Sequence, residues 1–383
     1  MDSFRSISRL LSFMLLLGLL VPPTAQAQQD EYILGDDDVW EGEPVEAGSQ
    51  QALVLRARQA LAMGQSDRAR AIASAFLDRH PLSPLRPEML LVRGDALLMM
   101  GDEYNALFDY EEIARKYPGS KVFVTALERE YQIAVEYAHG LKRKFLGTIR
   151  VINADDEAQE LLILIQERLP GSRLGEQAGM QLADFYFRKA KLRLAAEAYD
   201  LFIQNYPRSD KIEKARQRLI ESYLASYRGP NYDASGLRDA RARLENLRVT
   251  QPALAQRIGS KALLVRIYES EAQKLLVTAR WYRSIKDPVS AEQYIRRLVN
   301  RYPDSVATLN ALREIPELLK SLPEWVVANG PDYDALSLAL LGVGIKDAQG
   351  VPARPEVILP VSQPLQPTTP VRTSKEQPAG EGT

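Results

Sequence analysis

The residues that could perform acid–base, nucleophilic or metal chemistry are few and far apart in this chain. Among 383 residues there is no cysteine, and the two histidines, His80 and His139, are 59 positions apart with no second ligand at helical spacing beside either. Zinc sites draw on several such ligands, so we expect both histidines to lie at the surface or at helix ends. Asp155 and Asp156 are adjacent and would point apart on a helix, where they are suited to begin one. With no phosphate-binding glycine loop and no serine-nucleophile motif, the sequence predicts a protein that is not an enzyme and needs no cofactor or metal.

Composition also narrows the possible partners. The 49 Lys and Arg residues balance 50 Asp and Glu residues to a formal net charge of −1, which gives no bulk attraction for nucleic acid. Hydrophobic residues make up 45% of the chain, enough for a packed core. We therefore expect protein partners.

Two groups of side chains fit a surface that binds other proteins. Arginine and tryptophan are common anchors of protein interfaces, and residues three apart on a helix share a face. Two arginines in that relation can offer charge-assisted contacts to partner carboxylates. The candidate partner-binding residues are Arg280, Trp281 and Arg283 in one segment and Asp184, Phe187 and Arg188 in another. For Trp281, packing between helices is an open alternative.

A basic segment within residues 140–152 suggests a further contact. Lys142, Arg143 and Lys144 precede Phe145, and this combination suits the surface of an anionic membrane, where basic head groups lie above inserted apolar tips. The alternative is a loop that folds back onto the protein core, because apolar residues usually pack against protein.

The elements that must position these residues form a repeat. Six prolines each follow a helical pattern, at spacings of 37, 52, 37, 45 and 51: Pro81, Pro118, Pro170, Pro207, Pro252 and Pro303. Twelve residues before each proline there is an alanine, and five residues before each there is a large apolar residue. Offsets of −12, −8 and −5 lie on one helical face, so each unit carries an apolar stripe with a small residue where another helix approaches closely.

A preceding helix can be recognised in several units. In the second unit it runs from about Pro87 to Met100, with Gly94 twelve residues before Ala106 and with Gly101 as the turn. The order helix, turn, helix, proline is typical of tetratricopeptide repeats. An ordinary helical bundle shares the helical periodicity but lacks the turn and the proline that recur at the helix ends. We therefore predict an all-α, tetratricopeptide-like helical-hairpin solenoid of about five to six long repeats. Stacked helix pairs leave a concave groove lined by their first helices, and helical phase alone places the two groups of candidate partner-binding residues in it: Asp184, Phe187 and Arg188, and Arg280, Trp281 and Arg283.

The two ends of the chain differ from this middle part. Arg5 and Arg9 precede an apolar run and the small-residue pattern Ala25-Gln26-Ala27, which is the order of a secretory signal peptide. The predicted organisation is a signal peptide (1–27), an acidic disordered leader (28–50), the repeat domain (51–315), C-terminal capping helices (316–345) and a disordered Pro-rich tail (346–383).

The repeats carry a family resemblance. Tyr-Pro-x-Ser turns, the segment from Leu275 to Arg283 and the segment from Val299 to Ser305 together resemble the BamD lipoproteins of the outer-membrane β-barrel assembly machinery. The resemblance covers roughly residues 52–316. It implies a periplasmic, all-helical adaptor that docks on the barrel insertase. Family members carry a lipidated cysteine just after the signal peptide, whereas this chain has Gln28, so lipid attachment is not carried over.

These observations predict a non-catalytic repeat adaptor that is secreted across the inner membrane. In the periplasm such a protein can lie at the periphery of the outer membrane. Its expected partners are the outer-membrane barrel insertase or other envelope proteins. The alternative is an envelope scaffold that organises the cell envelope and has no nascent outer-membrane protein as a client.

Overall fold

The computed structural model describes residues 32–34, 40–42, 48–145 and 149–345. The predicted signal peptide, most of the acidic leader and the Pro-rich tail lie outside these residues. Within the leader, strands β1 (Tyr32–Leu34) and β2 (Trp40–Gly42) pair antiparallel. The acidic composition of the leader does not predict this pairing.

The chain divides into two compact units, residues 1–96 and 97–383. The first unit contains α2 (Gln50–Ala62), α3 (Ser66–Arg79) and most of α4 (Arg86–Met99). Ser49 begins α2 because its Oγ accepts a hydrogen bond from the amide of Ala52 at 3.1 Å. An ion pair of 2.6 Å joins Arg58 of α2 to Glu88 of α4.

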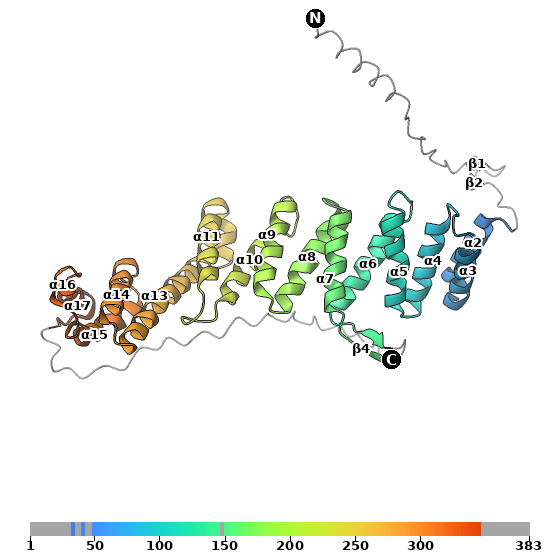
Figure 1. Ribbon diagram of the computed structural model, residues 1–383. Coiled ribbons are helices and arrows are strands. Elements are labelled where there is room, and N and C mark those ends of the chain that lie inside the picture. Colours follow the sequence, from blue (N-terminus) through green and yellow to red (C-terminus); the bar gives the residue numbers. More distant parts are fainter. Residues whose placement is uncertain (1–31, 35–39, 43–47, 146–148, 346–383) are drawn as a thin grey trace, which may run out of the picture. The chain divides into compact units, whose positions relative to one another are not determined.

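In the second unit, successive helices pack against one another (Figure 1). Its elements are α5 (Glu103–Lys116), α6 (Phe123–Ala138), β3 (Arg143–Phe145), β4 (Ile149–Ile152), α7 (Asp155–Arg168), α8 (Arg173–Arg188), α9 (Leu192–Asn205), α10 (Ile212–Ser226), α11 (Ser235–Thr250), α12 (Pro252–Arg257), α13 (Ser260–Ser284), α14 (Pro288–Arg301), α15 (Val306–Leu319), α16 (Glu324–Ala328) and α17 (Tyr333–Leu341).

The predicted repeat register is confirmed. The alanines twelve residues before the six prolines, from Ala69 to Ala291, are at most 1% exposed. The residues at −8 and −5 are at most 5% exposed, and they include the large side chains Tyr110, Tyr199 and Phe202. Each repeated stripe therefore lies in the core, and the fold is the expected all-α, tetratricopeptide-like series of helical pairs. We call the first helix of each pair the A helix and the second the B helix.

The turns between A and B helices need a left-handed backbone. Gly64 (φ 74°) and Gly101 (φ 68°) adopt it after α2 and α4, where a glycine has no Cβ to clash. Ala190 (φ 55°) and Lys286 (φ 61°) adopt the same conformation after α8 and α13. These two turns keep the geometry of the repeat without its preferred residue.

The longer spacings contain added elements. The 52-residue spacing holds the antiparallel β3–β4 hairpin between α6 and α7, which the sequence does not predict as strand. The 51-residue spacing holds α12 and the 25-residue helix α13. Helix α15 runs through Pro316, so no helix end marks the expected boundary between the repeat domain and the capping helices.

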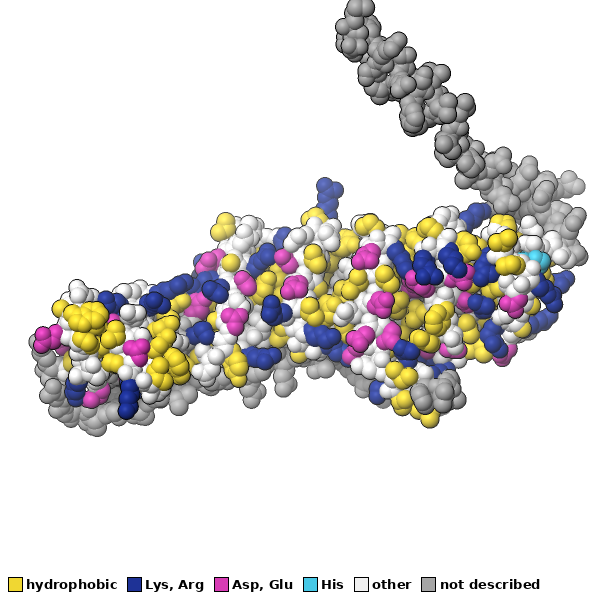
Figure 2. All heavy atoms as spheres, in the orientation of Figure 1, with side chains coloured by type: hydrophobic (Ala, Val, Ile, Leu, Met, Phe, Trp, Pro, Cys, Tyr) yellow, Lys and Arg dark blue, Asp and Glu magenta, His cyan; other side chains and the backbone are white. Residues whose placement is uncertain are grey.

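The surface of the described part is mixed in charge. Lys and Arg side chains alternate with Asp and Glu along the face shown in Figure 2, and hydrophobic side chains gather over the end that holds α16 and α17. Trp325 and Leu338 are 64% and 59% exposed there. None of the described helices combines the length and hydrophobicity needed to cross a membrane.

Candidate functional site

A groove with a volume of about 280 Å³ opens between the A helices α6, α8 and α10. It is lined by Tyr131 from α6, by Gln177, Met180, Gln181 and Asp184 from α8, and by Lys211 and Lys214 at the start of α10. The A helices of stacked pairs form the inner surface on which repeat proteins bind peptides, so this groove is the candidate functional site.

Helix α8 is buried on most sides and presents one polar stripe. Ser172 Oγ accepts a hydrogen bond from the amide of Gly175 at 3.0 Å and so begins the helix. A Cβ on Gly175 would lie 2.5 Å from the carbonyl oxygen of Leu169, so only glycine allows this approach. Of the remaining positions, Gln177, Gln181 and Asp184 stay partly exposed. They follow one another at helical spacing and face the groove.

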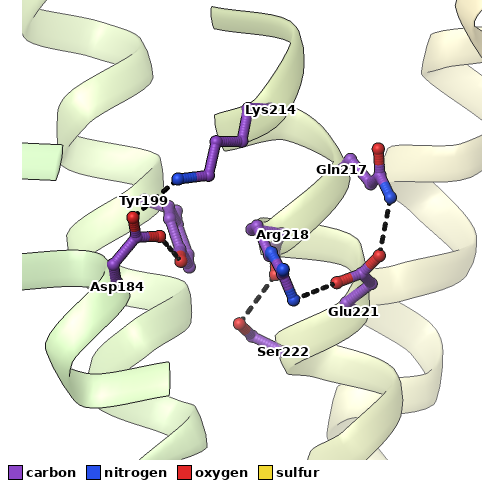
Figure 3. A network of polar contacts seen from close by, with 7 residues as sticks. All are labelled: Asp184, Tyr199, Lys214, Gln217, Arg218, Glu221 and Ser222. Carbon is purple, nitrogen blue, oxygen red and sulfur yellow. Dashed lines mark hydrogen bonds and ion pairs between the residues drawn. The ribbon is translucent and has the colours of Figure 1, made fainter. Parts of the chain in front are cut away.

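Asp184 links three helices (Figure 3). Its Oδ1 accepts a hydrogen bond from the hydroxyl of Tyr199 in α9 at 2.6 Å, and its Oδ2 accepts one from Lys214 Nζ in α10 at 2.6 Å. Burial, together with the neighbouring carboxylate, raises the pKa of Tyr199 above its usual range. Tyr199 therefore remains a hydrogen-bond donor, and both oxygens of Asp184 are occupied.

The other two candidates of the fourth repeat lie elsewhere. Phe187 is only 9% exposed, packed against Tyr199 and beneath the guanidinium of Arg218 at 4.7 Å, so the expectation that it faces the groove is wrong. Because Phe187 comes three residues after Asp184, its side chain points about 60° away from that of Asp184 around the helix axis, toward α9 and α10. Arg188 is exposed and donates to the carbonyl oxygen of Ala138, the last residue of α6, at 3.3 Å.

The candidates of the sixth repeat are bound within the protein. Arg280 Nη2 lies 2.5 Å from Glu314 Oε1 and Arg283 Nη1 lies 3.0 Å from Glu314 Oε2. The two arginines do share a face, but that face meets α15, whose carboxylate binds both. Trp281 is 55% exposed and packs edge-on against Tyr282, with ring centroids 4.8 Å apart. The arginines therefore hold α13 against α15. This surface does not offer a partner the two arginine contacts that the sequence predicts, because Glu314 binds both side chains.

The basic insertion folds back onto the protein through its hairpin. Arg143 is ion-paired with Glu157 and stacks over the ring of Tyr104 at 4.0 Å. On β4, Arg150 donates to Glu103 at 2.7 Å.

Opposite these contacts, Ile149 and Val151 are 62% and 55% exposed. Lys142 is exposed, Lys144 Nζ lies 3.5 Å from the carbonyl oxygen of Met100, and the side chain of Phe145 lies outside the described part. A membrane contact stays a prediction, with Arg143 already engaged inside the protein.

Buried carboxylates are the feature that sequence reasoning missed. Glu130 of α6 is fully buried and bound by Arg168 at 3.2 Å, while Arg168 also binds Glu111 at 2.7 Å. Burial raises the pKa of Glu130 to about 8, although Arg168 opposes the shift. The sequence signal for such a group is helical phase, because Glu130 shares the buried face of α6 with Ala126, Leu127, Ile133 and Ala134.

Both histidines end helices. His80 is the C-terminal cap of α3, with its ring 5.0 Å from that of Phe76, and His139 is the C-terminal cap of α6, with Nδ1 2.6 Å from the carbonyl oxygen of Val135. Within the described residues, no three His, Asp or Glu side chains are grouped to hold a metal ion.

Comparisons with known proteins agree with this geometry. Residues 153–324 match the outer membrane lipoprotein family YfiO, and residues 51–83 match a tetratricopeptide-repeat family. No curated protein sequence matches the chain.

Two solved structures are similar at low identity. One is a thermophilic tetratricopeptide-repeat protein of Thermus thermophilus, with 16% identity over 57% of this chain and 100% of that one and a TM-score of 0.26. The other is a tetratricopeptide-repeat protein of Parabacteroides merdae, with 12% identity over 76% and 97% of the two chains and a TM-score of 0.33. The family match at 153–324 contains α8 and α10 of the groove and the arginine pair on α13. Over residues 153–324 the chain is therefore similar to the YfiO outer membrane lipoproteins, in line with the BamD-like resemblance of its sequence, and over residues 51–83 it is similar to tetratricopeptide repeats.

Proposed function

We propose that this protein is a non-catalytic adaptor that binds envelope proteins at the outer membrane and takes part in the assembly of β-barrel outer-membrane proteins. The observation that carries the proposal is the groove on the A helices, because α8 and α10 both lie in the region similar to outer membrane lipoproteins. Repeat proteins bind extended or helical segments on this surface.

The chemistry of the groove supports binding over catalysis. A carboxylate acts as a general base only if one of its oxygens can reach the proton it removes. Asp184 has one oxygen held by Tyr199 and the other by Lys214. These contacts fix the groove wall, and the other polar groups of the lining are the Tyr131 hydroxyl, the amides of Gln177 and Gln181 and the ammonium group of Lys211.

We also propose that the protein acts in the periplasm after cleavage of residues 1–27, since the signal-peptide pattern and the family similarity point to the same compartment. Partner capture in that compartment provides the test. A photo-crosslinking amino acid at Gln181 in the groove is compared with one at Leu201, which is 56% exposed on the B helix α9.

Irradiation of intact cells should join the Gln181 variant, and not the Leu201 variant, to an outer-membrane barrel insertase or to β-barrel clients, as identified by mass spectrometry. Crosslinks from Gln181 only to envelope proteins unrelated to β-barrels would replace this function by that of an envelope scaffold. Equal crosslinking from both positions would contradict a role for the groove.

A further inference from the structure

The groove has more hydrogen-bond donors than its own residues use. Within the described residues Lys211 forms no ion pair, while its amide donates to Ser209 Oγ at 3.0 Å and so fixes the start of α10. Lys214 is bound to Asp184, whose second oxygen is taken by Tyr199 (Figure 3). The charge of Asp184 is therefore balanced by Lys214, and the groove keeps the unpaired ammonium group of Lys211, which favours an anionic ligand.

The spacing of the groove amides fits an extended chain. Gln177 and Gln181 are four residues apart on α8, about 6 Å along the helix axis. Backbone groups on one side of an extended peptide recur every two residues, at about 6.6 Å. The side-chain amide of Gln181 also donates a hydrogen bond to the hydroxyl of Tyr131 on α6, which leaves its second N–H and its carbonyl oxygen. Two side-chain amides at this spacing can therefore each bond a peptide group of one extended segment, with the apolar side chain of Met180 between them.

We propose that this groove binds an extended peptide segment rich in carboxylates, with Lys211 as the residue that binds a peptide carboxylate and with Gln177 and Gln181 as ligands for the peptide backbone. This inference rests on the proposed function and names the chemistry of the segment that a partner or client presents. The lysine lies in a groove between three helices, which a narrow peptide can enter and a flat bilayer surface cannot.

The test uses the chain without residues 1–27 and two fluorescein-labelled decapeptides with amidated C-termini, one of alternating Glu and Thr and one of alternating Gln and Thr. Fluorescence anisotropy at low ionic strength should show that the Glu peptide binds about threefold to fivefold more tightly, since an exposed ion pair contributes up to about 1 kcal/mol. Lys211→Gln should abolish this preference. The matched control is Lys261→Gln, because Lys261 is an exposed lysine on α13 away from the groove.

The backbone part of the proposal has its own variant. Gln181→Ala should weaken both peptides by the same factor, because the amide contacts groups that the two peptides share. Circular dichroism confirms that each variant retains its helical content.

Equal affinity for the two peptides, or equal effects of Lys211→Gln and Lys261→Gln, would overturn the proposal. Salt-dependent sedimentation with phosphatidylglycerol vesicles that depends on Lys211, without peptide binding, would also overturn it by assigning the lysine to lipid. Crosslinks from Gln181 to β-barrel proteins would still stand in those cases, so the failure of this inference is distinguishable from failure of the proposed function.

Discussion

Reversing the charges of Arg280 and Arg283 should destabilise the protein as well as change its surface. Arg280 donates to Glu314 Oε1 through Nε at 2.9 Å and through Nη2 at 2.5 Å, and Arg283 forms an ion pair with Oε2 at 3.0 Å. The side chains are 30%, 46% and 24% exposed for Arg280, Arg283 and Glu314. This exposure places the interaction between a surface pair of up to about 1 kcal/mol and a buried pair of about 3–5 kcal/mol.

From these contacts we expect Arg280→Glu with Arg283→Glu to cost about 2–4 kcal/mol. The substitutions remove two charge-assisted hydrogen bonds and one ion pair, and they bring two further carboxylates close to Glu314. For a cooperative unit of about 150–250 residues, that cost lowers the melting temperature by roughly 4–16 °C. Thermal unfolding followed by far-ultraviolet circular dichroism measures it.

Arg257→Glu is the matched control, because Arg257 pairs with Glu213 at a site where the side chains are 63% and 53% exposed. It should cost at most about 1 kcal/mol. Adding Glu314→Arg to the double variant should recover part of the loss by restoring opposite charges. Equal melting temperatures for the double variant and Arg257→Glu would refute this reasoning and return the arginine pair to the role of a solvated surface.

Two further substitutions test the buried acid and the strained turn. Burial raises the pKa of Glu130 to about 8, so the folded state holds this proton more tightly than the unfolded state; the resulting stability is complete below about pH 4.5 and is lost as the pH rises to 8. Glu130→Gln should therefore reduce the fall in melting temperature between pH 6 and pH 9, and an unchanged fall would contradict the assignment. Ala190→Gly should raise the unfolding free energy by up to about 1 kcal/mol in urea denaturation, because glycine relieves the left-handed backbone at φ 55° and loses part of that gain to unfolded-state entropy; a lower midpoint would argue against strain there.

The sequence predicts the repeat well because its signals are local. Ala195, Tyr199 and Phe202 lie on one face of one helix, and a single period of 3.6 residues places all three in the core. Proline and glycine mark the helix ends for equally local reasons. Asp184 was assigned to the groove from helical phase alone, and the structure places it there.

The expectations drawn from sequence fail where the surroundings of a side chain are set by a segment far away in the chain. Phase places Arg280 and Arg283 on one face, but Glu314, more than 30 residues later, decides what that face meets. Phe187 differs from Asp184 by about 60° around α8, which is within the uncertainty of a phase drawn from sequence. The β3–β4 hairpin joins basic and apolar residues that fit a membrane surface equally well, and only the positions of Tyr104 and Glu157 show that Arg143 is turned inward.

The cross-helix ion pairs distinguish the repeats from one another in a way that the shared alanine position cannot. Alanine stands at the same position in all six B helices, while the residue four positions later varies in size from Ala73 to Tyr110, so apolar packing specifies part of the repeat order and the ion pairs can specify more of it. The polar links of the second unit differ from junction to junction: Arg168 with Glu111 and Glu130, Asp155 with Lys189, Asp184 with Lys214, Glu271 with Arg241, and Glu314 with Arg280. A misplaced neighbour would leave a carboxylate or an arginine without its counterpart, at a cost of about 3–5 kcal/mol where the group is buried and of at most about 1 kcal/mol where the pair is exposed. These ion pairs therefore favour the native order of the repeats over other orders, and they oppose the exchange of helical pairs between chains during folding.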